Sequence, residues 1–163
     1  MDLHVLTKPA ASCWHSLTIP PAEARDALLA LETSAKEKLV MRVVRGGKAT
    51  TTADFFDEIA AALQFPLYFG ANWDALHDCA GDLEWLHART VVLLIVDAEL
   101  LLSAAPAGEL TKCVEVLSSV AKELAKTTKA RQPLALHVVA QSANKDVLTK
   151  RWHAAGGALA PLG

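Results

Sequence analysis

The sequence predicts an α/β domain in which a three-stranded parallel β-sheet packs against α-helices. Three runs rich in Val, Leu and Ile, at 39–45, 90–98 and 134–140, are typical of buried strands. Segments with helical spacing of apolar residues separate these runs, and a strand–helix–strand order favours right-handed crossovers between parallel strands. With 163 residues, 52% hydrophobic and 21% charged, the chain is expected to fold as one globular domain.

The first half of the chain carries start and stop signals for its helices. After an N-terminal stretch that supports no assignment, Pro20-Pro21 precedes a predicted helix over 22–38, because proline is tolerated in the first helical turn. The strand that follows ends at Gly46-Gly47, a turn signal. Threonines at 50–52 then predict a cap for a helix over 53–64.

The second half continues the alternation. Pro66 and Gly70 break the preceding helix, and Asn72 is a favourable N-cap for a helix over 73–83. Two further helices are predicted beyond the second strand, over 109–129 and 144–155.

Charge is distributed unevenly along the chain, although its formal net value is only −2. Residues 49–88 hold seven carboxylates and no Lys or Arg, whereas residues 104–163 hold eight basic and four acidic side chains. A partner for the acidic region should therefore be a basic protein. Nucleic acid is not expected there, because its phosphates would be repelled.

Several function classes lack sequence support. There is no apolar run of membrane-spanning length, and the N-terminus lacks the positive charge that precedes the apolar core of a secretion signal, so a cytoplasmic location is predicted. The three cysteines show no CxxC spacing, and no GxSxG, complete P-loop or GxGxxG occurs, so neither a cofactor nor a catalytic residue is predicted. His137 lies in an apolar strand, where a core histidine is expected.

The predicted helix at 73–83 is amphipathic. Asp74, Asp78 and Asp82 recur at intervals of four, opposite a face that contains Trp73 and Leu76. The apolar face is expected to pack on the sheet, which directs the carboxylates outward. Like charges at this spacing cost roughly 0.2–0.5 kcal/mol per pair. A solvated surface tolerates that cost, so the pattern alone allows either an ordinary exposed face or a partner-binding one.

Residues 68–79, YFGANWDALHDC, resemble the barstar family of intracellular ribonuclease inhibitors, whose motif reads aromatic-aromatic-Gly-x-Asn-x-Asp-Ala-Leu-x-Asp. The longer form FGxNWDALxDCxxDLxWL is similar to a bacterial barstar-like branch. The resemblance implies a compact barstar-like α/β domain over 38–141 in a protein that is not an enzyme. Residues 1–37 are then an N-terminal extension with a helix, and 142–163 a C-terminal extension packing on the same domain.

The resemblance also implies a mode of action. In the family, the acidic helix and the loop before it enter the active site of a secreted basic ribonuclease, and carboxylates occupy the places of substrate phosphates. Carried onto this chain, Asp78 is the dominant carboxylate and Asp74 the other motif aspartate. Tyr68 would stack on a partner His or Arg, Gly70 would present its backbone, and Asn72 would make a polar contact. Each of these three residues also has a structural explanation: Gly70 is needed for the turn, Asn72 for the helix cap, and Tyr68 for packing of its ring.

The predicted partner-binding set is Tyr68, Gly70, Asn72, Asp74, His77, Asp78 and Asp82. The chain departs from the best-known family member at His77, where that member has Trp, and at Leu83, where it has another aromatic. Family members also use an acid from the long helix, but Glu123 lies among lysines here and cannot be assigned that role from sequence. Asp82 is expected to supply extra negative charge instead.

The alternative hypothesis is a metal-dependent hydrolase that binds a divalent cation through Asp74, Asp78 and Asp82. A single exposed helix makes a poor metal cage, because metal sites usually draw their ligands from separate elements. The sequence predicts neither the identity of the basic partner nor the oligomeric state.

Overall fold

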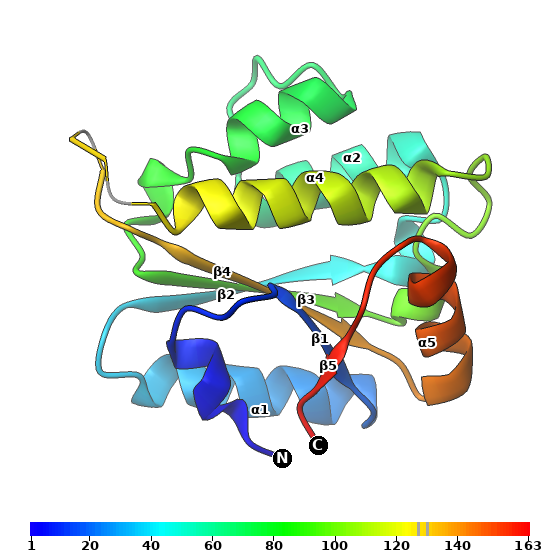
Figure 1. Ribbon diagram of the computed structural model, residues 1–163, viewed down its shortest axis with the longest axis horizontal. Helices are drawn as coiled ribbons and strands as arrows, with labels where there is room; N and C mark the ends of the chain where they lie inside the picture. The colour runs from blue at the N-terminus through cyan, green and yellow to red at the C-terminus, as the bar shows by residue number, and fades with distance from the viewer. Residues whose placement is uncertain (127, 130) are drawn as a thin grey trace.

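A five-stranded parallel sheet with helices on both faces forms the body of the protein (Figure 1). The computed structural model describes residues 1–126, 128–129 and 131–163. The strand order across the sheet is β2-β3-β4-β1-β5, and each neighbouring pair is parallel. The strands are β1 (Trp14–Leu17), β2 (Leu39–Arg45), β3 (Thr90–Val96), β4 (Ala135–Gln141) and β5 (Ala160–Pro161).

The helices form layers around this sheet. One face carries α1 and a short 3₁₀ turn, η1, and the other carries α2 and α4, with α3 outside them and α5 beside the sheet (Figure 1). The bounds are η1 (Leu3–Thr7), α1 (Pro21–Ser34), α2 (Thr52–Leu63), α3 (Trp73–Ala80), α4 (Glu109–Leu124) and α5 (Lys145–Ala154).

The predicted parallel α/β architecture is confirmed, but the predicted number of three strands is wrong. The N-terminal stretch supplies β1, which inserts between β4 and β5 with Trp14 opposite Val138 and His15 opposite Ala160. Neither added strand has a strong sequence signal. β1 is only four residues, WHSL, and β5 is two residues, one of which is Pro161.

The central strand β3 is buried along its whole length. Val91, Leu93 and Ile95 belong to the core under α2 and α4, whereas Val92 and Leu94 belong to the core under α1. This alternation follows from the two-residue period of a strand, and it explains why β3 is a nearly continuous apolar run.

Helix ends agree with the prediction at some caps and differ at others. The Thr51 side chain accepts a hydrogen bond from the backbone N–H of Asp54 at 3.2 Å, so the predicted cap of α2 is confirmed. α1 ends at Ser34 and α4 at Leu124, earlier than predicted, although residue 127 of the predicted 109–129 helix lies outside the described residues. Within the described part of the chain, no helix combines the length and hydropathy needed to span a bilayer.

Candidate partner-binding site

The acidic helix α3 packs on other helices and not on the sheet. Leu76 and Ala80 are fully buried, and α3 makes its main contacts with α4. Half-buried Trp73 lies against Phe55 and Phe56 of α2, with ring centroids 5.6 and 4.9 Å apart. The predicted packing on the sheet is wrong, because α2 and α4 already cover that face (Figure 1). α3 therefore forms an outer layer that presents its polar side to solvent.

A carboxylate at the start of α4 holds the amino end of α3. Glu109 Oε2 accepts hydrogen bonds from the Trp73 indole N–H at 3.1 Å and from the Thr52 hydroxyl at 3.0 Å. Lys112 Nζ donates to Glu109 Oε1 at 2.8 Å. The Lys112 hydrogen bond, aided by those from Thr52 and Trp73 and opposed by burial, holds the pKa of Glu109 below its ordinary value. Because Thr52 begins α2 and Trp73 begins α3, Glu109 joins the amino ends of three helices.

An arginine holds the other end of α3. The Arg131 guanidinium donates one hydrogen bond to the carbonyl oxygen of Gly81, just after α3, and another at 3.1 Å to that of Glu123 in α4. Carbonyls at a helix end lack intrahelical donors, so a guanidinium is a suitable partner for them. Sequence reasoning did not identify Glu109 or Arg131, since each acts on residues distant in the chain.

The helix ends earlier than predicted, which moves Asp82 off the α3 face. Leu83 has a left-handed backbone (φ 52°) and a fully buried side chain, so the chain turns inward there and the helix cannot continue. Asp82 Oδ1 accepts a hydrogen bond from the backbone N–H of Glu84 at 3.3 Å. The prediction that three aspartates share one helix face is therefore wrong for Asp82, which lies in the following turn.

The outer face of α3 presents Asp74 and Asp78, one helical turn apart. Both are exposed, and the Asp78 side chain keeps 85% of its surface accessible. The His77 ring lies between helices, with Nε2 3.4 Å from Ser119 Oγ and 3.7 Å from Glu123 Oε1, and Nδ1 3.9 Å from Asp78 Oδ1. The packing of α3 on α4 thus brings Glu123 beside the acidic helix, which no pattern within α4 could indicate.

The loop before α3 carries the other predicted residues. Tyr68 is 80% exposed. The Asn72 side chain accepts from the backbone N–H of Ala75 at 2.8 Å and donates to the Gly70 carbonyl at 3.2 Å, which confirms the predicted cap. A Cβ on Gly70 would lie 3.2 Å from Asn72 Nδ2, so glycine lets the loop pass close to this cap. Gly70 and Asn72 therefore shape the loop.

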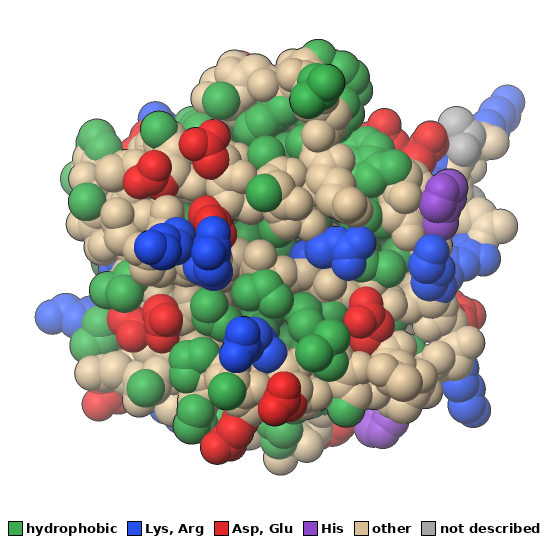
Figure 2. Space-filling model, turned by 180° about the vertical axis from the view of Figure 1, so that it is seen from behind, with side chains coloured by type: hydrophobic (Ala, Val, Ile, Leu, Met, Phe, Trp, Pro, Cys, Tyr) green, Lys and Arg blue, Asp and Glu red, His purple; other side chains and the backbone are tan. Residues whose placement is uncertain are grey.

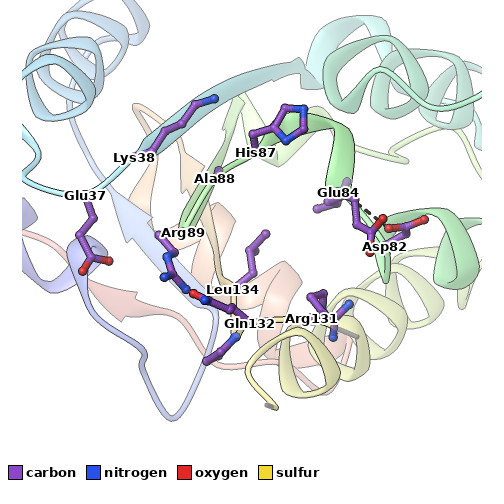
Figure 3. Close-up of a pocket in the computed structure, with 12 residues that line it drawn as sticks. Glu37, Lys38, Asp82, Glu84, His87, Ala88, Arg89, Arg131, Gln132 and Leu134 are labelled. Atoms are coloured by element: carbon purple, nitrogen blue, oxygen red, sulfur yellow. Dashed lines mark hydrogen bonds between the residues drawn. The ribbon is translucent and has the colours of Figure 1, made fainter. Parts of the chain in front are cut away.

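Two open hollows adjoin the site. One, of about 410 Å³, lies between α3 and the end of α4, and the other, of about 550 Å³, lies at the amino ends of β2, β3 and β4 (Figure 3). Both are lined by side chains of both charge signs, unlike the enclosed apolar pockets that hold small molecules. Asp82, Glu84 and Arg131 line both hollows; His77, Asp78 and Glu123 line the first, and Glu37, Lys38, His87 and Arg89 the second.

The metal hypothesis loses support from this geometry. Among the residues that the structure describes, no three His, Cys, Asp or Glu side chains are grouped so that they could hold a metal ion. Asp82, the third carboxylate of the hypothesis, lies beyond the end of α3.

A comparison with protein-family models matches residues 39–141 to the family described as Barstar (barnase inhibitor). The match spans more than half of the chain and includes the whole YFGANWDALHDC motif. The chain belongs to the barstar family. No curated protein matched it.

Barstar family membership confirms the resemblance on which the sequence prediction rests. The barstar match begins with β2 and ends with β4, so it contains α2, α3 and α4, whereas the two unpredicted strands, β1 and β5, lie outside it. Members of the barstar family are non-enzymatic inhibitors, so the prediction that the chain is not an enzyme is confirmed. Membership suggests a barnase-like ribonuclease as the kind of partner.

Proposed function

We propose that the protein inhibits a barnase-like ribonuclease by placing the outer face of α3 over the cationic active site of that enzyme. The observation that carries the proposal is Asp78, an exposed carboxylate on a helix held at one end by Glu109 and at the other by Arg131. A carboxylate on such a fixed helix can meet a cationic pocket without losing much conformational freedom on binding.

The charges around α3 favour a basic partner. Among the described residues, no Lys or Arg forms an ion pair with Asp74 or Asp78. By contrast, Glu58 of the same acidic region pairs with Arg45, whose hydrogen bond lowers the pKa of Glu58. The two exposed carboxylates of α3 therefore keep their charge available to a partner, whereas that of Glu58 is already paired within the protein.

The predicted site residues have distinct roles in this proposal. Asp78 enters the cationic pocket of the ribonuclease. Asp74 and Asp82 add to the negative electrostatic field that attracts and orients the enzyme. Tyr68 stacks on a partner His or Arg. Gly70 and Asn72 set the path of the loop, and the backbone at Gly70 is open to the partner. His77 adds shape beside Asp78.

Glu123 extends the proposed face onto α4. Its carboxylate is half exposed and lies 3.7 Å from the His77 ring. It supplies the long-helix acid that sequence reasoning could not assign.

A cytoplasmic location of the inhibitor stays a prediction.

The experiment is calorimetric titration of a barnase-like ribonuclease with the wild type and with Asp78→Asn, alongside a ribonuclease activity assay. The substitution should leave the fold intact, because the Asp78 side chain is exposed. Binding should weaken by about 3 kcal/mol or more, because a cationic pocket loses its buried countercharge.

The matched control is Asp57→Asn, which removes an exposed aspartate of the same acidic region from α2. It should change affinity only slightly. Equal effects of the two substitutions would mean that overall charge, and not the α3 face, governs binding. No binding by the wild type would contradict the proposed function itself.

A further inference from the structure

The turn before α3 exposes two large apolar side chains at its tip. The backbone N–H of Phe69 donates to the carbonyl of Pro66 at 3.0 Å, which closes a four-residue turn with Leu67 and Tyr68 at its centre. Leu67 is 106% and Tyr68 80% exposed, the highest values among the exposed large hydrophobic side chains of the described residues. Turn centres usually hold Gly, Asn, Asp, Ser or Pro, so a Leu-Tyr pair is unusual there.

Aromatic packing holds this turn in place from below. The rings of Phe65 and Phe69 have centroids 5.0 Å apart, and Phe69 contacts Phe56 of α2 at 6.0 Å. Phe65 also meets Trp85 edge-on at 6.5 Å. The residues on either side of the tip are therefore anchored, while the tip itself makes no contribution to the core. A partner that buries the tip would order little additional chain.

The turn and α3 belong to one projecting lobe. The loop rises beside α3 at the top of the molecule, and the view from behind shows hydrophobic side chains gathered on this lobe (Figures 1 and 2). A surface that docks on Asp74 and Asp78 would thus extend over the neighbouring turn. Interfaces commonly combine charged contacts with an apolar anchor of this kind.

We propose that Leu67 forms an apolar knob that enters a socket on the ribonuclease, next to the cationic pocket that receives Asp78, while Tyr68 beside it keeps the stacking role given above. The inference rests on the proposed function and specifies the partner further: the basic enzyme must offer apolar surface beside its active site. In this arrangement charge accelerates association, and burial of Leu67 slows dissociation.

The test measures association and dissociation rates with a barnase-like ribonuclease at low and at high salt. Leu67→Asn should fold normally, because the side chain is exposed and Asn suits a turn centre. It should raise the dissociation rate by roughly 10- to 100-fold, the range expected for losing a buried leucine. This factor should be the same at both salt concentrations, whereas the effect of Asp78→Asn on association should shrink as salt rises.

The matched control is Leu29→Gln, which removes another exposed leucine, located on α1 across the sheet, and should change neither rate. If Leu67→Asn leaves the dissociation rate unchanged while Asp78→Asn weakens binding, the proposed role of Leu67 is refuted and the proposed function stands. If the wild type does not bind, both are overturned. Sedimentation that shows a wild-type dimer dissociated by Leu67→Asn would also overturn the knob, because its occupant would then be a second copy of the chain.

Discussion

Two buried histidines should make the fold sensitive to acid. His15 on β1 and His137 on β4 are 4% and 1% exposed, and His15 Nε2 lies 3.0 Å from His137 Nδ1. His137 Nε2 lies 2.9 Å from the Lys8 carbonyl, which can only accept, so this nitrogen carries the proton. His137 Nδ1 then accepts from His15 Nε2–H, and both rings are neutral. The prediction that His137 is a core histidine is therefore confirmed.

The size of the acid effect follows from the pKa of His15. Burial, with a smaller effect of His137, lowers this pKa to about 4, against about 6.5 for an unfolded histidine. Between these values the unfolded chain binds a proton that the native state does not, so the free energy of unfolding falls as pH falls. At about pH 5 the loss from His15 is about 2 kcal/mol, since each pH unit below 6.5 contributes about 1.4 kcal/mol. Burial also lowers the pKa of His137, which acts in the same direction.

Urea denaturation of the wild type and of His15→Gln at about pH 7.5 and pH 5 measures this effect. The glutamine stays neutral and can still donate to His137, so the variant should lose about 2 kcal/mol less than the wild type on acidification. His153→Gln, which removes an exposed histidine, is the control. Equal acid losses in the wild type and His15→Gln would refute the reasoning. If His15→Gln does not fold, NMR of the imidazole ring of His15 in the wild type replaces the comparison. The ring should still be neutral at about pH 5, and a protonated ring there would refute the reasoning.

Two further predictions concern the scaffold. Gly46→Ala should destabilise the fold by roughly 3 kcal/mol in urea denaturation, because the added Cβ would lie 2.3 Å from the carbonyl oxygen of Asp97. The control is Gly47→Ala, which should change stability little, because its Cβ would meet only a flexible leucine side chain at 3.6 Å. Glu109→Ala should cost about 1–2 kcal/mol, because the part-buried donors of Thr52 and Trp73 lose their acceptor, while exposed Lys112 can turn to water. It should also weaken ribonuclease binding by releasing the start of α3. A stability equal to that of Glu115→Ala, on the exposed side of α4, would contradict this role of Glu109.

Local signals predicted much of the domain. The β-branched runs of β2, β3 and β4 and the caps at Thr51 and Asn72 depend on neighbours in sequence, and each is present in the structure. β1 escaped prediction because its stability comes from pairing with β4 and β5 and from packing of Trp14 on Trp152, which the four residues themselves do not indicate.

The candidate site was predicted as far as its motif extends. The exposure of Tyr68, Asp74 and Asp78 agrees with a partner-binding role, although the roles of individual residues stay predictions. The end of α3 was misplaced because the buried Leu83 overrides the helical pattern. Glu123 joins the site only through the packing of one helix on another.

The most direct measurement is an NMR titration of the isotope-labelled protein with a barnase-like ribonuclease. Docking through α3 predicts that the largest shift changes fall on residues 66–82 and around Glu123, with α1 and η1 unaffected. Shift changes concentrated on α1, on the opposite face of the sheet, would contradict the account.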